Sequence, residues 1–96
     1  MARFVLSPSA QADVDEIWAY TVERWGVEQA ELYVRQLGSA VETIAQNPQR
    51  GRPCDEIREG YRWYPSGSHV VFYRITTKEV VVVRMLHQRM DFNRHV

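Results

Sequence analysis

Hydrophobic residues in the first half of the chain recur with the period of an α-helix. A short alternating segment, Arg3 to Leu6, predicts a strand, after which Ser7 can cap a helix that starts at Pro8. Positions spaced by three and four residues then follow, at Val14, Ile17, Trp18, Thr21 and Trp25. This spacing predicts one buried helical stripe, with both tryptophans in the core, in a helix that ends at Gly26.

A second helical pattern follows at once and stops at Asn47-Pro48. Its apolar positions are Ala30, Tyr33, Val34, Leu37, Val41 and Ile44. Because the link between the two patterns is so short, we expect an antiparallel helical hairpin whose apolar stripes face each other and a sheet.

Strand-forming residues fill most of the second half. The segments 61–64, 69–75 and 80–86 are rich in aromatic and β-branched residues, and turn sequences separate them, so they predict a three-stranded antiparallel meander. The four valines at 80–83 are typical of a central strand. The order β, α, α, β, β, β predicts an α+β fold of two layers, a helical hairpin packed on a small, mainly antiparallel sheet. The other sheet face is expected to be open to a partner.

Length and composition are those of one small globular domain. The chain has 96 residues, of which 45% are hydrophobic and 25% charged, so residues 1–96 are expected to form a single domain. No apolar run reaches the roughly 18 residues of a membrane span, and the first residues lack the apolar stretch of a signal peptide. Cys54 is the only cysteine and cannot form an internal disulfide. These features predict a cytoplasmic protein with no membrane partner.

Charge is divided unequally along the chain. Residues 1–48 carry three basic and seven acidic side chains, whereas residues 49–96 carry nine basic and five acidic ones. Eleven of the twelve basic residues are arginine, whose planar guanidinium suits carboxylate, phosphate and aromatic partners. The second half is therefore the better candidate for recognition.

The densest polar cluster lies after the last predicted strand, in residues 84–96, which we call the exit segment. We predict that target binding involves its charged or titratable members, Arg84, His87, Arg89, Asp91, Arg94 and His95, although each of them alone is also compatible with a solvated tail.

An RNA-cleaving alternative would use His87 as general acid or base, with Arg62 and Arg84 stabilising a phosphate. Arg62 is equally able to pair with Glu56 or Glu59, and Arg84 to pair across the sheet. The sequence pI near 6.8 is also not that of a protein that docks on RNA by charge. We therefore assign no catalytic residue and expect no direct sequence-specific binding of nucleic acid.

Neither a metal nor another cofactor is predicted, because the three histidines and Cys54 lack the spacing of a zinc site. Trp63 and Tyr64 are adjacent strand residues and must face opposite sides of the sheet. We expect one of these two side chains to be exposed or covered by a partner.

Over its whole length the chain resembles the ParE toxins of the RelE/ParE superfamily, the toxin halves of bacterial type II toxin-antitoxin modules. Four blocks carry the resemblance, in the order LSPSAQADVDEIWAYTVERWGVEQAELY, NPQRGRP, GYRWYPSGSHVVFYRI and VVVVRMLHQRMDFNRH. The resemblance implies a β, α, α, β, β, β toxin that inhibits DNA gyrase. It also implies a ParD-like antitoxin whose flexible C-terminal part wraps over the toxin.

The RelE branch of the superfamily instead cuts messenger RNA on the ribosome. Arg62 and Arg84 look like basic positions of that pattern, and His87 is the nearest candidate proton carrier. The lysines of the RelE site have no lysine counterpart in this sequence, although Arg50 and Arg52 could replace them. A third possibility is a non-toxic partner-binding module whose target surface has decayed.

For antitoxin contact we predict acidic residues on the outer face of the first helix, Asp13, Glu16 and Glu23, together with the strand aromatics Trp63 and Tyr64. The carboxylates would accept basic antitoxin side chains, but they are equally compatible with a solvated surface. An antitoxin strand could join the free sheet edge, and an amphipathic helix could lie in a groove beside the helical hairpin.

Overall fold

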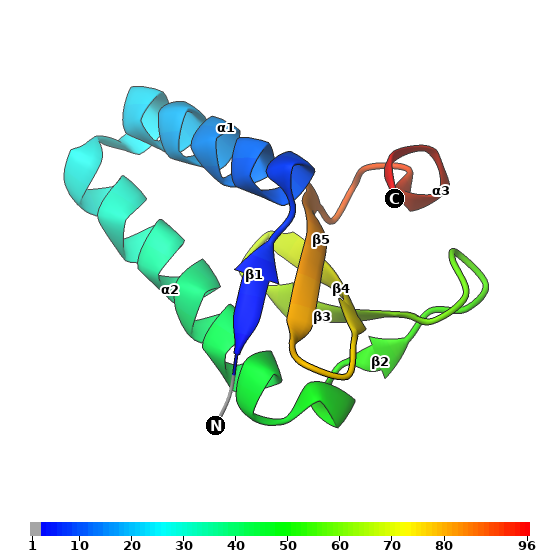
Figure 1. Ribbon diagram of the computed structural model, residues 1–96. Coiled ribbons are helices and arrows are strands. Elements are labelled where there is room, and N and C mark those ends of the chain that lie inside the picture. Colours follow the sequence, from blue (N-terminus) through cyan, green and yellow to red (C-terminus); the bar gives the residue numbers. More distant parts are fainter. Residues whose placement is uncertain (1–2) are drawn as a thin grey trace.

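Two long helices pack on one face of a five-stranded sheet in the computed structural model, which describes residues 3–96 (Figure 1). The elements in chain order are β1 (Phe4–Leu6), α1 (Pro8–Trp25), α2 (Val27–Gln46), the 3₁₀ turn η1 (Pro48–Arg50), β2 (Arg52–Pro53), β3 (Tyr61–Ser66), β4 (His69–Ile75), β5 (Val80–His87) and α3 (Phe92–His95). The predicted order of strands and helices is confirmed. Three short elements, η1, β2 and α3, form where the sequence predicted only a loop and an exit segment.

Both ends of α1 are set by local chemistry, as predicted. The Ser7 hydroxyl oxygen accepts a hydrogen bond from the Ala10 amide at 3.0 Å, and Pro8 occupies the first turn, where its missing N–H costs nothing. Gly26 separates the two helices with a φ of 92°, a value that side chains disfavour. The chain therefore turns sharply at one residue, and α2 packs against α1 as it leaves the turn.

The last strand occupies the middle of the sheet. The strand order is β1-β5-β4-β3-β2, so β5 is hydrogen-bonded to β1 on one side and to β4 on the other. β1 runs parallel to β5, whereas the other neighbours are antiparallel. The prediction that the valine run forms a central strand is confirmed. β1 ends at the pair Leu6–Val82, which leaves the second half of β5 without a strand on that side.

The core between the helices and the sheet contains residues from every long element. Its largest fully buried members are Leu37, Val41, Ile44, Val71, Tyr73, Val80 and Val82. The predicted apolar stripe of α2 is confirmed at Ala30, Leu37, Val41 and Ile44, which are buried, whereas Tyr33 and Val34 are half-buried.

The predicted stripe of α1 is wrong in two places. Trp18 and Trp25 are 37% and 69% exposed, and the residues of α1 that are buried are Ala10, Asp13, Ile17 and Thr21. The buried stripe thus contains two polar residues, which is possible because both are satisfied: the Thr21 hydroxyl donates to the Ile17 carbonyl at 2.6 Å, and Asp13 binds an arginine.

The expectation that the second sheet face is open is also wrong. A second cluster of buried residues, Cys54, Val70, Phe72 and Leu86, lies on this face. The loop after β2 covers it with Ile57, and the exit segment covers it with Phe92 and Val96, on the side of the sheet opposite the helical hairpin (Figure 1). Burial raises the pKa of the Cys54 thiol, and the charges of Glu56 and Asp55 raise it further.

A tyrosine in the core fixes the loop between α2 and β3. The Tyr73 hydroxyl accepts from the Gly51 amide at 2.9 Å and donates to the Pro48 carbonyl at 2.7 Å, and its burial raises the pKa of the phenol. Arg62 donates to backbone and side-chain oxygens of Gln49 and to the Gly51 carbonyl, so neither predicted glutamate partner is used.

Within residues 3–96 no helix has the length and apolarity to cross a membrane.

Candidate functional site

A groove of about 800 Å³ lies between α1, the start of β4 and the end of β5. α1 and the start of α2 form one wall, and the sheet with the loop after β5 forms the other. The rim carries three large apolar side chains with high exposed fractions, Tyr20 at 60%, Trp25 at 69% and Met90 at 37%. Exposed apolar side chains gathered at a groove mark a binding surface.

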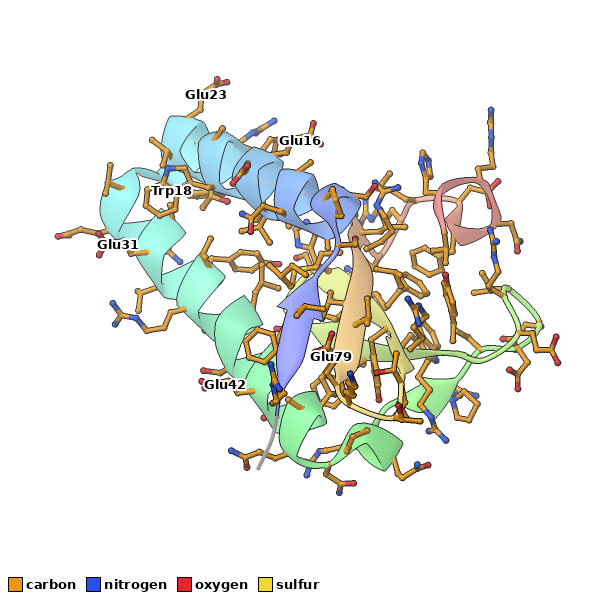
Figure 2. All side chains as sticks on the ribbon, viewed as in Figure 1. Glu16, Trp18, Glu23, Glu31, Glu42 and Glu79 are labelled. Carbon is orange, nitrogen blue, oxygen red and sulfur yellow. The ribbon has the colours of Figure 1, made fainter. Side chains whose placement is uncertain are left out.

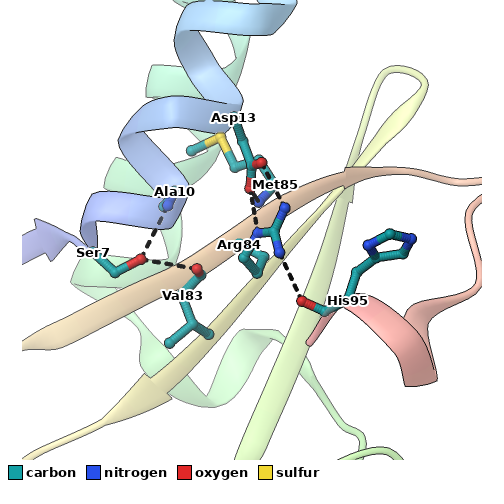
Figure 3. A network of polar contacts seen from close by, with 7 residues as sticks. All are labelled: Ser7, Ala10, Asp13, Val83, Arg84, Met85 and His95. Atoms are coloured by element: carbon teal, nitrogen blue, oxygen red, sulfur yellow. Dashed lines mark hydrogen bonds and ion pairs between the residues drawn. The ribbon is translucent and has the colours of Figure 1, made fainter.

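The floor of the groove contains a carboxylate–guanidinium pair that joins α1 to β5 (Figure 3). Arg84 donates from Nε to Asp13 Oδ2 and from Nη2 to Asp13 Oδ1, both at 2.8 Å. The side chain of Asp13 is 7% exposed and that of Arg84 is 25% exposed. The hydrogen bonds to Asp13 raise the pKa of Arg84, an effect that burial partly opposes.

The burial of Asp13 is explained by a backbone amide of β5 that has no acceptor on a neighbouring strand. With β1 ending at Leu6, the Met85 amide has no strand to bond on that side, and it donates to Asp13 Oδ2 at 2.9 Å. The carboxylate thus replaces a strand carbonyl and neutralises Arg84 at the same time. The prediction that Asp13 lies on the acidic outer face is wrong, since its carboxylate faces the sheet.

Two histidines and a tyrosine meet at the other end of the groove. His69 and His87 are cross-strand partners, with ring centroids 5.4 Å apart. The Tyr33 hydroxyl contacts His69 Nδ1 at 2.5 Å and accepts from the Ser68 amide at 2.9 Å, which joins α2 to the β3–β4 turn. The pKa of His69 is lowered, chiefly by burial and then by the charge of His87, while Asp13 acts in the opposite direction.

The predicted target-binding residues do not form one patch. Arg84 and His87 line the groove, whereas Arg89, Asp91, Arg94 and His95 are exposed on the loop after β5 and on α3. Asp91 caps α3 by accepting from the Asn93 amide at 3.2 Å, and the His95 carbonyl accepts from Arg84 Nη1 at 2.8 Å (Figure 3). The part of the exit segment that follows β5 is therefore folded back onto the sheet.

Of the residues predicted for antitoxin contact, Glu16 and Glu23 are exposed and project outward from α1 (Figure 2). Glu16 also lines the groove, whereas Glu23 does not. Trp63 and Tyr64 face opposite sides of the sheet, as predicted, but both are half-buried. The chain itself covers Trp63, because Phe92 and Phe72 pack against its ring.

Sequence reasoning did not identify five of the groove residues as binding residues, which are Tyr20, Trp25, Tyr33, His69 and Met90. Tyr20 lies off the apolar stripe of α1, and an aromatic residue in that position is a signal that could have been used. The helical periodicity predicts Tyr33 and Trp25 as core residues, and the sequence offers no pattern that marks His69 as a binding residue. In the part of the chain from residue 3 onward, no three His, Cys, Asp or Glu side chains gather as they would around a metal ion.

The helical hairpin on a mixed sheet is the fold of a known class of small proteins. A solved structure described as the chromosomal ParDE TA system from P. aeruginosa matches with a TM-score of 0.80, covering 91% of this chain and 96% of that chain. Its sequence identity is 24%, so the match shows the fold alone.

Sequence comparisons then identify the family. A family model described as the ParE toxin of type II toxin-antitoxin system, parDE, matches residues 4–92. Toxin ParE1 of Mycobacterium tuberculosis is 54% identical over 96 residues, which cover 99% of this chain and 98% of the relative. Toxin ParE1 of Caulobacter vibrioides is 48% identical, with 100% and 99% covered. The chain belongs to the ParE toxin family of type II toxin-antitoxin systems.

Proposed function

We propose that this toxin inhibits DNA gyrase and is neutralised by a ParD-type antitoxin that binds in the groove between α1 and β5. The observation that carries the antitoxin part of the proposal is the groove itself, with its exposed apolar rim and the exposed carboxylate of Glu16. The match to a solved ParDE system supports an antitoxin partner of this type.

The groove has the chemistry of a site for an amphipathic segment with basic residues. Tyr20 and Trp25 on one wall and Met90 on the other offer apolar contacts, which are strong when water is excluded around aromatic anchors. Glu16 lies at the groove with its carboxylate exposed, so it is available to a basic partner residue. Asp13 is not available in the same way, because three hydrogen bonds already occupy its oxygens.

For the target we propose the exposed residues after β5, which are Arg89, Asp91, Arg94 and His95. The gyrase assignment rests on membership of the ParE family. Inhibition by binding needs no acid–base group, and the residues proposed for RNA cleavage are not set up together: Arg62 does not line the groove, and the charge of Arg84 is matched by Asp13.

The antitoxin part of the proposal is tested by alanine substitution on the rim. Trp25→Ala and Tyr20→Ala are expected to weaken binding of a ParD-type antitoxin at least tenfold each, as truncation of an aromatic anchor does, measured by isothermal titration. Leu32→Ala is the matched control, since Leu32 is exposed on α2 and does not line the groove. Equal affinities for the three variants would refute the groove as the antitoxin site.

The target part is tested by DNA supercoiling with purified gyrase beside a ribosome-dependent messenger RNA cleavage assay. We expect supercoiling to be lost and RNA to stay intact, and Arg94→Ala to relieve the inhibition. Cleaved RNA with normal supercoiling would refute the gyrase assignment and favour the RelE-type activity. If neither activity is affected and expression without an antitoxin is harmless, the chain is a non-toxic binding module.

A further inference from the structure

The first half of β5 shows how this strand holds a parallel neighbour. The Val80 amide donates to the Arg3 carbonyl at 3.0 Å. The Val82 carbonyl accepts from the Ser7 amide at 2.9 Å. In a parallel pair with this register, Val5 of β1 lies between the Val80 carbonyl and the Val82 amide. One extended residue of β1 is thus placed between two backbone groups of β5 that lie two residues apart.

Beyond the end of β1, the cap and the first turns of α1 bond the same edge of β5. A bulge at Val83 turns the odd-numbered residues that follow away from β4. The Val83 carbonyl accepts from the Ser7 hydroxyl at 2.9 Å. The Met85 amide donates to Asp13 Oδ2 at 2.9 Å. A hydroxyl and a carboxylate therefore take the place of strand backbone at these two positions.

The next two backbone groups along this edge are unpaired. The Gln88 amide donates to the Ser68 carbonyl, next to β4, so the His87 amide one residue earlier points to the opposite side. Within residues 3–96 neither the Met85 carbonyl nor the His87 amide has a hydrogen-bond partner. Both residues line the groove, and Met85 is only 4% exposed. Because shielded backbone groups are nearly always paired, this donor and this acceptor point to a ligand that brings its own backbone.

The groups that are still free select one direction for such a ligand. An antiparallel strand would use both the amide and the carbonyl of Met85 and of His87. The Met85 amide is already bonded to Asp13, and the His87 carbonyl accepts from the Met90 amide at 2.9 Å. A parallel strand needs only the Met85 carbonyl and the His87 amide, as Val5 needs one carbonyl and one amide further back along β5.

We propose that the antitoxin segment in the groove is extended where it meets β5 and runs parallel to it, with one residue that donates its amide to the Met85 carbonyl and accepts from the His87 amide. The two residues on either side of it lie in register with Met85 and His87 and share the groove face of the sheet. Apolar side chains are expected at these two positions, because Tyr20 and Met90 lie on the rim. The inference rests on the proposed antitoxin function and adds the conformation, direction and side-chain pattern of the bound segment.

The decisive measurement is NMR scalar coupling across hydrogen bonds in the complex of the full chain with a ParD-type antitoxin, both labelled with ¹³C and ¹⁵N. We expect the His87 amide nitrogen to couple to a carbonyl carbon of the antitoxin. The Met85 carbonyl carbon is expected to couple to the amide nitrogen of that same antitoxin residue. The bond from the Val80 amide to the Arg3 carbonyl is the internal control, since it should give a coupling in the same spectrum.

Other outcomes separate the alternatives. Couplings to two different antitoxin residues would show an antiparallel segment, and the absence of both couplings beside a visible control would show a helical segment or one bound elsewhere. Either result would overturn the proposal. Isothermal titration of the same samples distinguishes this failure from that of the proposed function: an antitoxin that binds and is weakened by Trp25→Ala leaves the groove as its site, whereas an antitoxin that does not bind refutes both.

A pair of substitutions at one position tests the amide separately. His87→Pro removes the backbone N–H at a place where the chain itself does not use it, and His87→Ala is the matched control because both variants lack the imidazole. We expect His87→Pro to bind the antitoxin at least fivefold more weakly than His87→Ala, about the loss of one backbone hydrogen bond. Equal affinities for two variants with unchanged circular dichroism would overturn the proposal. The coupling measurement uses the unaltered chain and does not depend on how the proline variant folds.

Discussion

Substitution of Asp13 should destabilise the fold more than any other change to a charged residue of α1. In the Asp13→Ala variant Arg84 loses two charge-assisted hydrogen bonds, and the Met85 amide loses its acceptor. Because a quarter of the Arg84 side chain is exposed, water replaces part of the lost interaction, and we assign about 2 kcal/mol to the pair. An unsatisfied backbone amide adds about 1 kcal/mol, which gives about 3 kcal/mol in total.

The Asp13→Asn variant separates these two contributions. Its amide oxygen can still accept from the Met85 amide, so we expect a loss of about 2 kcal/mol, or about 10 °C in the melting temperature of a domain of this size. The assay is thermal and urea unfolding followed by circular dichroism, with Asp15→Asn as the control, since Asp15 is exposed and bonds only Gln11 in the same helix. A melting temperature of Asp13→Asn within 2 °C of that control would refute the assigned role of the carboxylate.

Three further predictions concern other buried groups. The pKa of His69 is lower in the folded than in the unfolded chain, so the unfolded chain binds a proton at this histidine first as the pH falls. The free energy of unfolding should therefore decrease from about pH 7.5 to below 6.5. In urea titrations, His69→Gln should make this pH dependence flatter. Gly51→Ala should prevent folding or cost at least about 3 kcal/mol by calorimetry, because an added Cβ would overlap the Tyr73 ring. The buried Cys54 thiol, with its raised pKa, should react with a maleimide only at the rate of unfolding; fast labelling of folded protein would contradict its burial.

The parts of the fold that depend on local sequence could be predicted. The start of α1 at Ser7-Pro8, its end at Gly26 and the stripe of α2 follow from caps and periodicity, and the structure confirms them. The burial of Asp13 could not be predicted in this way, because its partners, Arg84 and Met85, lie more than seventy residues away in the chain. A polar residue on a helix is expected in solvent until its distant partner is known.

The same reason explains the two misplaced tryptophans. Once Asp13 faces the sheet, α1 is rotated so that Ile17 and Thr21 are buried and Trp18 and Trp25 lie at the surface. A groove beside the hairpin was predicted, but its wall on β5 was not, since that wall depends on where β1 ends in the sheet. The cover provided by Phe92 was missed because four residues carry too weak a periodic signal to predict a helix.

The position of β5 between β1 and β4 has a consequence for synthesis of the chain. The first strand cannot pair until the second-to-last element has been made, and the Ser7 hydroxyl bonds a carbonyl 76 residues further on. Contacts between such distant residues form late in folding. α1 and α2 are therefore translated well before the strand that supplies the opposite wall of their groove. A partner that recognises this groove can therefore bind it only once β5 has been translated, because one wall of the groove does not exist before then.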